Sequence, residues 1–365
     1  MHIELDSPNL GELEKKYLCD CVDSTFVSTI GPFVTKFEEG FAAYLHTTRA
    51  VSVQSGTAAL HIALVELGIG AGDEVILPAL TFVASANPVR YVGAVPVFAD
   101  VDPVTWTMSA EAVEAAITPR TKAIMPVHIY GNPCDMDAIM AIAKKHDLFV
   151  IEDATESLGA TYNGQFTGTI GDIGCYSFNG NKVITTGGGG MVVAKEDKRA
   201  EHMKFLVNQA RDASKGFYHT EIGYNMRMTN LEASLGLAQM ERLNGFLEQK
   251  KRFNQIYREV LADVPFVKFQ NELPNAKSAW WLSSVTINHL RKDIPTIQRE
   301  LKERGIPTRR LFVPITKFPP YAEFNRDCTP VTDELYTYGL NLPSSTVNSE
   351  EAARFVAESL KEICR

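Results

Sequence analysis

The sequence lacks the cysteine pattern of disulfide-rich and zinc-binding proteins, the positive charge of nucleic-acid-binding proteins and the histidine motifs of metalloenzymes. Its six cysteines are scattered over 365 residues, without the spacing of a zinc site or the density of a disulfide scaffold. The formal net charge is −8, so no overall basic field favours nucleic acid or an anionic membrane. The eight histidines form no His-x-His or His-Glu-x-x-His motif. These absences predict reduced thiols, no metal site and no nucleic-acid partner.

Long hydrophobic runs are also missing. No stretch approaches the roughly 20 consecutive apolar residues that a transmembrane helix needs, and the N-terminus has neither the basic region nor the apolar region of a signal peptide. The composition, 45% hydrophobic and 22% charged, is typical of a soluble globular chain with a sizeable core. We therefore expect a cytoplasmic protein that does not associate with membranes.

Short apolar runs recur between residues 49 and 194 at intervals of roughly 25 residues, the length of a strand plus a crossover helix. Their nearly continuous hydrophobicity suits a parallel sheet that is covered on both faces. The last two runs lie too close together for a helical crossover, so the final strand should return antiparallel. The predicted strands, which form a mixed and mostly parallel sheet of seven, are 50–53, 74–77, 95–98, 123–127, 148–151, 175–178 and 191–194.

The chain changes character after residue 195. Helical patterns cover 198–209 and 231–260, and the second follows a capping-type segment from Thr229 to Glu232. A smaller α+β region then fits a strand over 278–288 and helices over 294–304 and 349–364. We expect an α/β protein with a large domain over 1–245, which includes an N-terminal lead-in, and a small C-terminal α+β domain over 246–365.

Small residues open the helix that follows the first strand. The segment Ser55 to Leu60 should begin a helix that runs to about Leu67. A helix N-terminus offers free backbone N–H groups and a positive dipole, which is what phosphate binding requires. Gly56, Thr57 and Ala58 therefore form a candidate phosphate cradle. The segment matches neither the Rossmann fingerprint nor a P-loop, and it also fits a capped helix packed closely on its sheet.

Two later strand ends carry an acid and an amine. Asp153 follows a hydrophobic strand, where a carboxylate can keep a pyridine nitrogen protonated, as in pyridoxal phosphate enzymes. Lys182 follows a strand end and an Asn-Gly turn and precedes the glycines 187–190, so its amine can form a Schiff base with a closely approached cofactor. Ser177 offers a hydroxyl to the phosphate. Each residue alone also fits a helix cap or a solvated side chain; together they indicate pyridoxal phosphate.

The order of these motifs resembles the DegT/DnrJ/EryC1/StrS family of nucleotide-sugar aminotransferases, which belongs to the aspartate-aminotransferase-like group of pyridoxal phosphate enzymes. The resemblance covers almost the whole chain and implies an aspartate-aminotransferase-like three-layer fold. The matching segments are Ile30-Gly31-Pro32, Phe37-Glu38, Ser55 to Leu60, Gly72 to Val75, Pro78 to Phe82, Val127 to Gly131, Glu152 to Ala154, Ser177-Phe178 with Lys182, and Gly223 to Asn230.

The resemblance also implies roles for individual residues. Lys182 would be the catalytic residue that forms the Schiff base, and Asp153 would pair with the pyridine nitrogen. The other implied cofactor contacts are Thr57, Ala58 and Ser177 at the phosphate, Phe82 stacked on the ring, Glu156 at the ring oxygen, and Asn225 at the phosphate of the neighbouring subunit. The role of Asn225 implies a homodimer with shared active sites.

The implied reaction transfers the amino group of L-glutamate to a nucleotide-linked keto sugar, with release of 2-oxoglutarate and with pyridoxamine phosphate between the two halves. Its product would be an amino sugar for a surface polysaccharide such as lipopolysaccharide. We expect substrate contacts at Asn181, Arg227, Phe312 and Tyr321. Candidate cations for the nucleotide diphosphate are Lys204, Arg211, Arg227, Arg309 and Arg310.

Two other functions stay open at this point. A regulatory protein that binds pyridoxal phosphate would keep the lysine and the cradle, although no DNA-binding domain or basic arm is appended. A different enzyme of the same fold, such as a desulfurase or an amino-acid aminotransferase, lacks support from a loop cysteine signature. The dehydratase branch of the family carries histidine at the position of Lys182, so this lysine argues against a dehydratase.

Three segments depart from many relatives. Glu156 stands where glutamine or histidine is common, the glycines 187–190 stand where Gly-Glu-Gly-Gly is common, and residues 311–321 stand where a Pro-Leu-His segment is common. The segments 156–159 and 179–186 look most like the branch that makes UDP-bacillosamine and legionaminate precursors. This finer resemblance implies a UDP-linked 4-keto-6-deoxy-N-acetylhexosamine as the substrate.

Overall fold

A computed structural model describes residues 2–288 and 291–365. Its main sheet has the strand order β1-β9-β8-β5-β4-β2-β3. All neighbouring strands are parallel except β9, which is antiparallel to both β1 and β8. The strands are β1 (Ala50–Val53), β2 (Glu74–Pro78), β3 (Val95–Ala99), β4 (Thr121–Ile124), β5 (Phe149–Asp153), β8 (Ile173–Ser177) and β9 (Gly190–Ala194). The predicted mixed sheet of seven strands is confirmed, including the antiparallel return.

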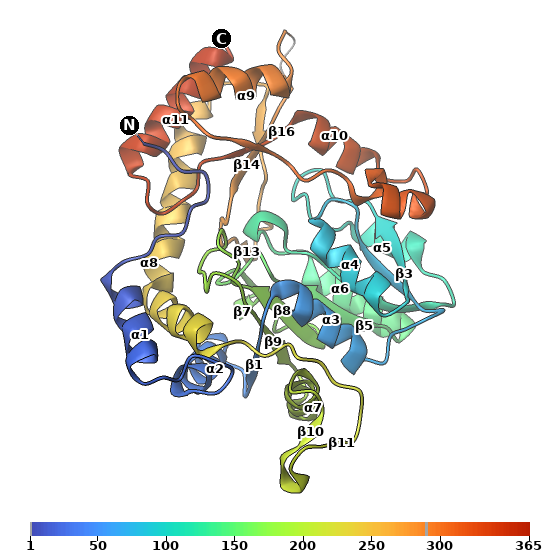
Figure 1. Cartoon of the computed structure of the whole chain (residues 1–365). Coiled ribbons are helices and arrows are strands. Elements are labelled where there is room, and N and C mark those ends of the chain that lie inside the picture. Colours follow the sequence, from blue (N-terminus) through green and yellow to red (C-terminus); the bar gives the residue numbers. More distant parts are fainter. Residues whose placement is uncertain (1, 289–290) are drawn as a thin grey trace.

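Helices cover both faces of this sheet, which explains why its strands are almost wholly apolar. One hydrophobic cluster joins α3, α4, α5, α6 and α7 to the sheet, and it extends over both faces because it includes consecutive strand residues such as Val75, Ile76 and Leu77. A second cluster packs α2 and the first part of α8 against β1, β8 and β9. The layers are visible in Figure 1. The helices are α2 (Pro32–Leu45), α3 (Gly56–Glu66), α4 (Val83–Tyr91), α5 (Ala110–Ala116), α6 (Met136–His146), α7 (Asp197–Val207) and α8 (Asn230–Leu261).

The helix α8 joins the two parts of the molecule. It begins at the predicted capping box, in which the N–H of Glu232 donates to Thr229 Oγ1 (3.3 Å) and the N–H of Thr229 donates to Glu232 Oε2 (2.7 Å). Its second half packs in a separate cluster with α9, α11 and a small antiparallel sheet of order β12-β14-β16-β15. These elements are β12 (Val267–Phe269), β14 (Ser283–Ile287), α9 (Ile294–Glu303), β15 (Arg309–Arg310), β16 (Gly339–Leu342) and α11 (Glu350–Ile363).

The small part differs from expectation in its first strand. The sequence predicts a strand over 278–288, but β14 begins only at Ser283. The backbone before it is committed elsewhere, because the N–H of Ala279 donates to Gly131 O (3.0 Å) and Trp280 has a positive φ of 49°. The predicted boundary near residue 245 falls inside α8 and stays a prediction. Shorter elements are α1 (Glu12–Asp23), β6 (Thr161–Tyr162), β7 (Gln165–Phe166), β10 (Arg211–Asp212), β11 (Tyr218–His219), β13 (Ala276–Lys277) and α10 (Pro330–Tyr338).

The N-terminal lead-in packs on the rest of the chain in two pieces. Helix α1 lies against α8. Before it, the N-terminal strap (residues 3–9) follows the small part near α11, as the blue trace in Figure 1 shows. Within the two ranges that the structure describes, no helix has both the length and the apolar content needed to cross a membrane, and no three possible metal ligands cluster.

Candidate active site

A cavity of about 540 Å³ lies where β5 and β8 end and α3 begins. Ligands of open α/β sheets bind at this edge, beyond the carboxyl ends of the strands. The cavity is lined by Ser55, Gly56, Thr57, Leu60, Phe82, Ala84, Ser85, Asp153, Thr155, Glu156, Ser177, Asn179, Asn181, Lys182, Gly188, Gly189, Trp281, Arg309 and Phe312. The structure therefore brings together most of the residues that the sequence predicts for a cofactor site.

Lys182 is held from two sides. Its Nζ lies 3.5 Å from Glu156 Oε1 and 4.1 Å from the centroid of the Trp281 ring. The turn before it is closed by a hydrogen bond from the N–H of Lys182 to Asn179 O (3.0 Å). Trp281 Nε1 also donates to Asn181 O at 2.6 Å. The amine is thus aimed into the cavity by a carboxylate and an aromatic face.

Asp153 ends β5 and is buried. Its Oδ2 accepts a hydrogen bond from Ser85 Oγ (2.6 Å), and its Oδ1 accepts bonds from the hydroxyl (2.6 Å) and the N–H (3.2 Å) of Thr155. These donors hold the carboxylate in one orientation at the cavity wall. An oriented carboxylate at this position can keep the proton on a ring nitrogen.

Glu156 is a buried acid that faces the lysine. Its Oε2 accepts the N–H of Tyr130 at 2.8 Å, and its Oε1 faces Lys182. Burial raises the pKa of the Glu156 carboxyl, although the nearby lysine and the Tyr130 N–H oppose this effect. A proton is therefore held at this position more readily than on an exposed glutamate.

The start of α3 forms a close-packed cradle. Ser55 caps the helix, with its Oγ accepting the N–H of Ala58 at 3.0 Å. A Cβ added to Gly56 would lie 2.7 Å from Ser177 Cβ, so only glycine lets the helix approach the end of β8 this closely. The first N–H groups of a helix have no partner inside it. Gly56, Thr57 and Ser177 thus fit a phosphate group, whereas the N–H of Ala58 is already used by Ser55.

Several predicted residues lie elsewhere. Asn225 is exposed outside this cavity. Tyr321 is buried against Phe98, with its hydroxyl donating to Asn87 Oδ1 (2.5 Å), and does not line the cavity. Arg227 is also outside the cavity, and its buried Nε has no hydrogen-bond partner among the described residues.

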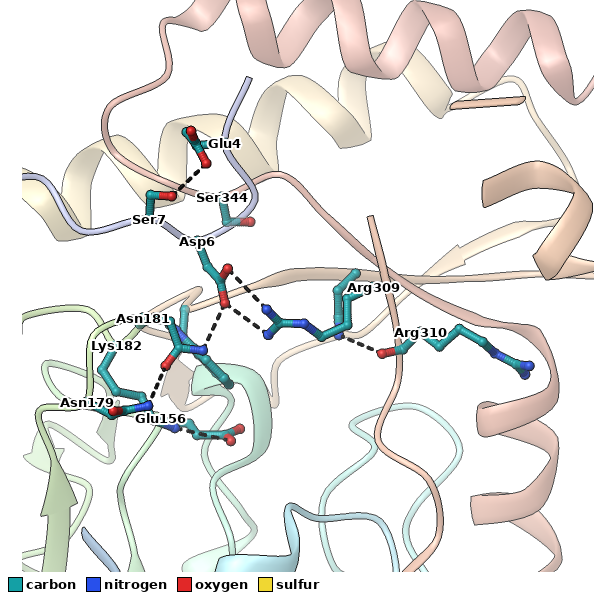
Figure 2. A network of polar contacts seen from close by, with 12 residues as sticks. Glu4, Asp6, Ser7, Glu156, Asn179, Asn181, Lys182, Arg309, Arg310 and Ser344 are labelled. Atoms are coloured by element: carbon teal, nitrogen blue, oxygen red, sulfur yellow. Dashed lines mark hydrogen bonds and ion pairs between the residues drawn. The ribbon is translucent and has the colours of Figure 1, made fainter. Parts of the chain in front are cut away.

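Among the five candidate cations, the structure brings Arg309 to the cavity wall. Apart from Arg227, described above, the others have local partners: Lys204 pairs with Glu38, Arg211 donates to Gly216 O (2.8 Å), and Arg310 donates to Tyr336 O. Arg309 itself is paired with Asp6 of the N-terminal strap (Figure 2).

Sequence reasoning missed four residues of the site. Ser85 and Thr155 lie just beyond the motifs that contain Phe82 and Asp153, so their positions were a usable signal. Trp281 was assigned to a strand, and Asp6 stands in a segment without any motif. Both reach the site only through the tertiary packing of the small part and the strap.

Comparison with known proteins agrees with this geometry. The model of the DegT/DnrJ/EryC1/StrS aminotransferase family matches residues 8–361. A protein of Caulobacter vibrioides named GDP-perosamine synthase is 41% identical over 363 residues, which cover 99% of this chain and 98% of the relative. One of the same name from Escherichia coli O157:H7 is 40% identical over 99% of this chain and 98% of the relative.

The fold is shared with solved structures. The PMP form of the putative sugar aminotransferase Spr1654 from Streptococcus pneumoniae superposes with a TM-score of 0.94 at 27% identity, over 100% of this chain and 98% of that one. A PLP form of the same protein superposes equally well. The aminotransferase fold expected from the sequence is therefore confirmed. The chain belongs to the DegT/DnrJ/EryC1/StrS aminotransferase family.

Proposed function

We propose that this protein moves the amino group of L-glutamate to a nucleotide-linked keto sugar, with pyridoxal phosphate held in the cavity around Lys182. The observation that carries the proposal is the convergence of Lys182, Asp153 and the start of α3 on one cavity. They supply the amine, the carboxylate and the anion site that the aldehyde, ring nitrogen and phosphate of this cofactor need.

Each residue has a distinct task. When bound, pyridoxal phosphate supplies an electron sink for negative charge on the α-carbon of the substrate. Lys182 would bond to the cofactor between turnovers and, once displaced by the amino donor, would carry a proton to and from that carbon. Asp153 would retain the proton on the ring nitrogen, held in place by Ser85 and Thr155.

The two half-reactions use the same groups in opposite directions. In the first, glutamate gives up its amino group and leaves as 2-oxoglutarate. In the second, the ketone carbon of the sugar takes up that amino group, its oxygen leaves as water in place of the water consumed in the first half, and the sugar is released as an amine. Lys182 serves both because the proton transfers of the second half reverse those of the first. The buried Glu156 carboxyl, 3.5 Å from Lys182 Nζ, would assist by stabilising the protonated amine.

A GDP-linked keto sugar is the acceptor best supported by the comparisons. The two relatives named GDP-perosamine synthase match this chain from end to end. They do not support the finer resemblance to the UDP-bacillosamine and legionaminate branch, so a UDP-linked N-acetylhexosamine is no longer the preferred substrate. Arg309 is placed to meet an anionic group of either substrate.

We also propose a homodimer with shared sites, as the predicted role of Asn225 requires. Asn225 is exposed, and Phe217 and Ile222 nearby in the sequence are 85% and 88% exposed. Large exposed apolar side chains of this kind favour a surface that a second copy covers. Sedimentation at micromolar concentration tests this: a monomer with full activity would contradict it.

The substrate is tested by incubating the enzyme and L-glutamate with GDP-, dTDP- and UDP-linked keto sugars. Mass spectrometry should find the amino sugar with a GDP-linked acceptor and 2-oxoglutarate in equal amount. An amino product formed only from UDP-linked sugars would refute the nucleotide assignment. No product from any sugar, with the cofactor bound, would favour a regulatory binding protein.

A further inference from the structure

The N-terminal strap is fixed by backbone hydrogen bonds at Glu4 and Leu5, directly before Asp6. The N–H of Ser344 donates to Leu5 O at 2.7 Å. Glu4 and Asn348 exchange two hydrogen bonds, from the N–H of Glu4 to Asn348 Oδ1 (2.9 Å) and from Asn348 Nδ2 to Glu4 O (2.7 Å). A backbone held in this way presents one side chain in a fixed place. That side chain is Asp6.

Asp6 contacts two residues of the cavity wall, and Figure 2 shows it between them. Its Oδ2 accepts a hydrogen bond from Asn181 Nδ2 (2.9 Å) and lies 2.9 Å from Arg309 Nη1, while its Oδ1 accepts a bond from Arg309 Nη2 (3.2 Å). Only 11% of the Asp6 side chain is exposed. Such a two-point contact fixes the plane of the guanidinium as well as its position.

The contact with Asn181 continues to the catalytic amine. Asn181 directly precedes Lys182, and its carbonyl accepts the Trp281 Nε1–H at 2.6 Å. The ring of the same Trp281 lies 4.1 Å from Lys182 Nζ. Asp6 therefore supports both the turn that carries the lysine and the aromatic face on which the lysine rests.

The charges around this network decide what Asp6 does electrostatically. Asp6 faces Arg309 directly and the buried Lys250 at longer range; Lys250 Nζ donates to the carbonyls of Trp281 (3.1 Å) and Ser344 (2.8 Å). The cavity that holds Lys182 also contains Glu156, Asp153 and Arg309. Without Asp6, the wall of that cavity would gain one unpaired positive charge.

We propose that Asp6 is a positioning residue for Lys182, which holds the lysine turn through Asn181 and neutralises Arg309 in the resting enzyme. An anionic group of the substrate then exchanges with Asp6 on Arg309 when it enters. The proposal rests on the proposed function in taking Lys182 as the amine that bonds to the cofactor. It adds a task for a segment that no motif singled out.

The test measures the pH midpoint of the absorbance change of the lysine-bonded cofactor in the holoenzymes of the wild type and four variants. Asp6→Asn keeps an acceptor for Asn181 but removes the charge, so the midpoint should fall by roughly 0.5–1 pH unit because an unpaired cation disfavours a protonated imine. Arg309→Gln should raise the midpoint by a similar amount, and the double variant should return it close to the wild-type value. Glu4→Gln, in the same strap but bonded to Ser7, should leave it unchanged.

Opposite shifts that cancel distinguish charge compensation from a general disturbance of structure, which would move the midpoint the same way in both single variants. An unshifted midpoint in Asp6→Asn, an equal shift in Glu4→Gln, or no restoration in the double variant would overturn the role of Asp6. Each of these outcomes is measured on enzyme whose colour shows the cofactor bonded to lysine, so each would leave the proposed function intact. A wild type that stays colourless with pyridoxal phosphate would overturn both.

A second arm tests the connection through Asn181. Single-turnover reaction with glutamate should slow about tenfold in Asp6→Ala, which corresponds to ~1.4 kcal/mol. Asn181→Ala should slow it as well, and the double variant should be no slower than the slower single variant, since the two residues act in series. Additive losses would show that Asp6 does not act through Asn181.

Discussion

Gly56 offers a quantitative test of the phosphate cradle. An alanine Cβ at this position would lie 2.7 Å from Ser177 Cβ and 3.1 Å from both Ser177 Oγ and Thr155 Cγ2. Carbon atoms pack at about 3.5–4.0 Å, so Gly56→Ala must push the start of α3 and the end of β8 apart by several tenths of an ångström. Both segments would bind the same phosphate.

The expected cost follows from overpacking. Extra methyl groups in a well-packed site cost about 1–3 kcal/mol, and replacing glycine in a helix returns about 0.5–1 kcal/mol. The middle of these ranges leaves about 1.3 kcal/mol of strain. If that strain falls on the cofactor site, the affinity for pyridoxal phosphate should drop roughly tenfold, because 1.4 kcal/mol is a factor of about ten. Titration of the cofactor-free protein by fluorescence quenching measures this affinity.

Gly245 provides the matched control. It lies in α8, and a Cβ there would meet nothing within 4 Å. Gly245→Ala should therefore stabilise the protein by about 0.5–1 kcal/mol in a denaturant titration without changing cofactor affinity. A folded Gly56→Ala protein that binds the cofactor as tightly as the wild type would refute the cradle.

Three further predictions concern buried and exposed polar groups. Glu156→Gln keeps an acceptor for the Tyr130 N–H but removes the charge beside Lys182, and single-turnover transfer from glutamate should slow about tenfold; a rate within a factor of two would exclude a part for the carboxylate. Burial lowers the pKa of Lys250 to about 8, so above that pH the unfolded state binds more protons than the folded state. Between pH 8 and about 10.5, the unfolding free energy of the wild type should therefore rise by up to ~3 kcal/mol relative to that of Lys250→Met. Parallel stability curves for the two proteins would contradict this. Asn225→Ala and Lys182→Ala should each be inactive alone yet regain part of the activity when mixed and refolded together, since one site in the mixed dimer is then intact; no recovery would argue against shared sites.

The main sheet was predictable because its physics is local. Each parallel strand buried on both faces gives an apolar run, and the spacing of the runs reveals the crossover helices. The small sheet lacks this signal: β15 is the polar pair Arg309–Arg310, and β16 is the four-residue stretch Gly339–Leu342. Their place is decided by pairing with β14 and by packing on α8, α9 and α11.

The site shows the same division. Lys182, Asp153 and the start of α3 were predictable together because the carboxyl ends of parallel strands meet at one sheet edge. Trp281 and Asp6 were not, since they reach that edge from segments far away along the chain. Tyr321 is a different case: its substrate contact stays a prediction, and the turn that carries it, Pro319–Phe324, packs beside β3 and buries its ring outside the cavity.

The most direct test of the central claim is to identify the residue that bonds to the cofactor. Protein loaded with pyridoxal phosphate should be yellow, and after borohydride reduction and digestion the cofactor mass should lie on the peptide that contains Lys182. Lys182→Ala, treated in the same way, should carry no attached cofactor and should release no 2-oxoglutarate from glutamate. Attachment to another lysine, or a wild type that binds no cofactor, would contradict the account.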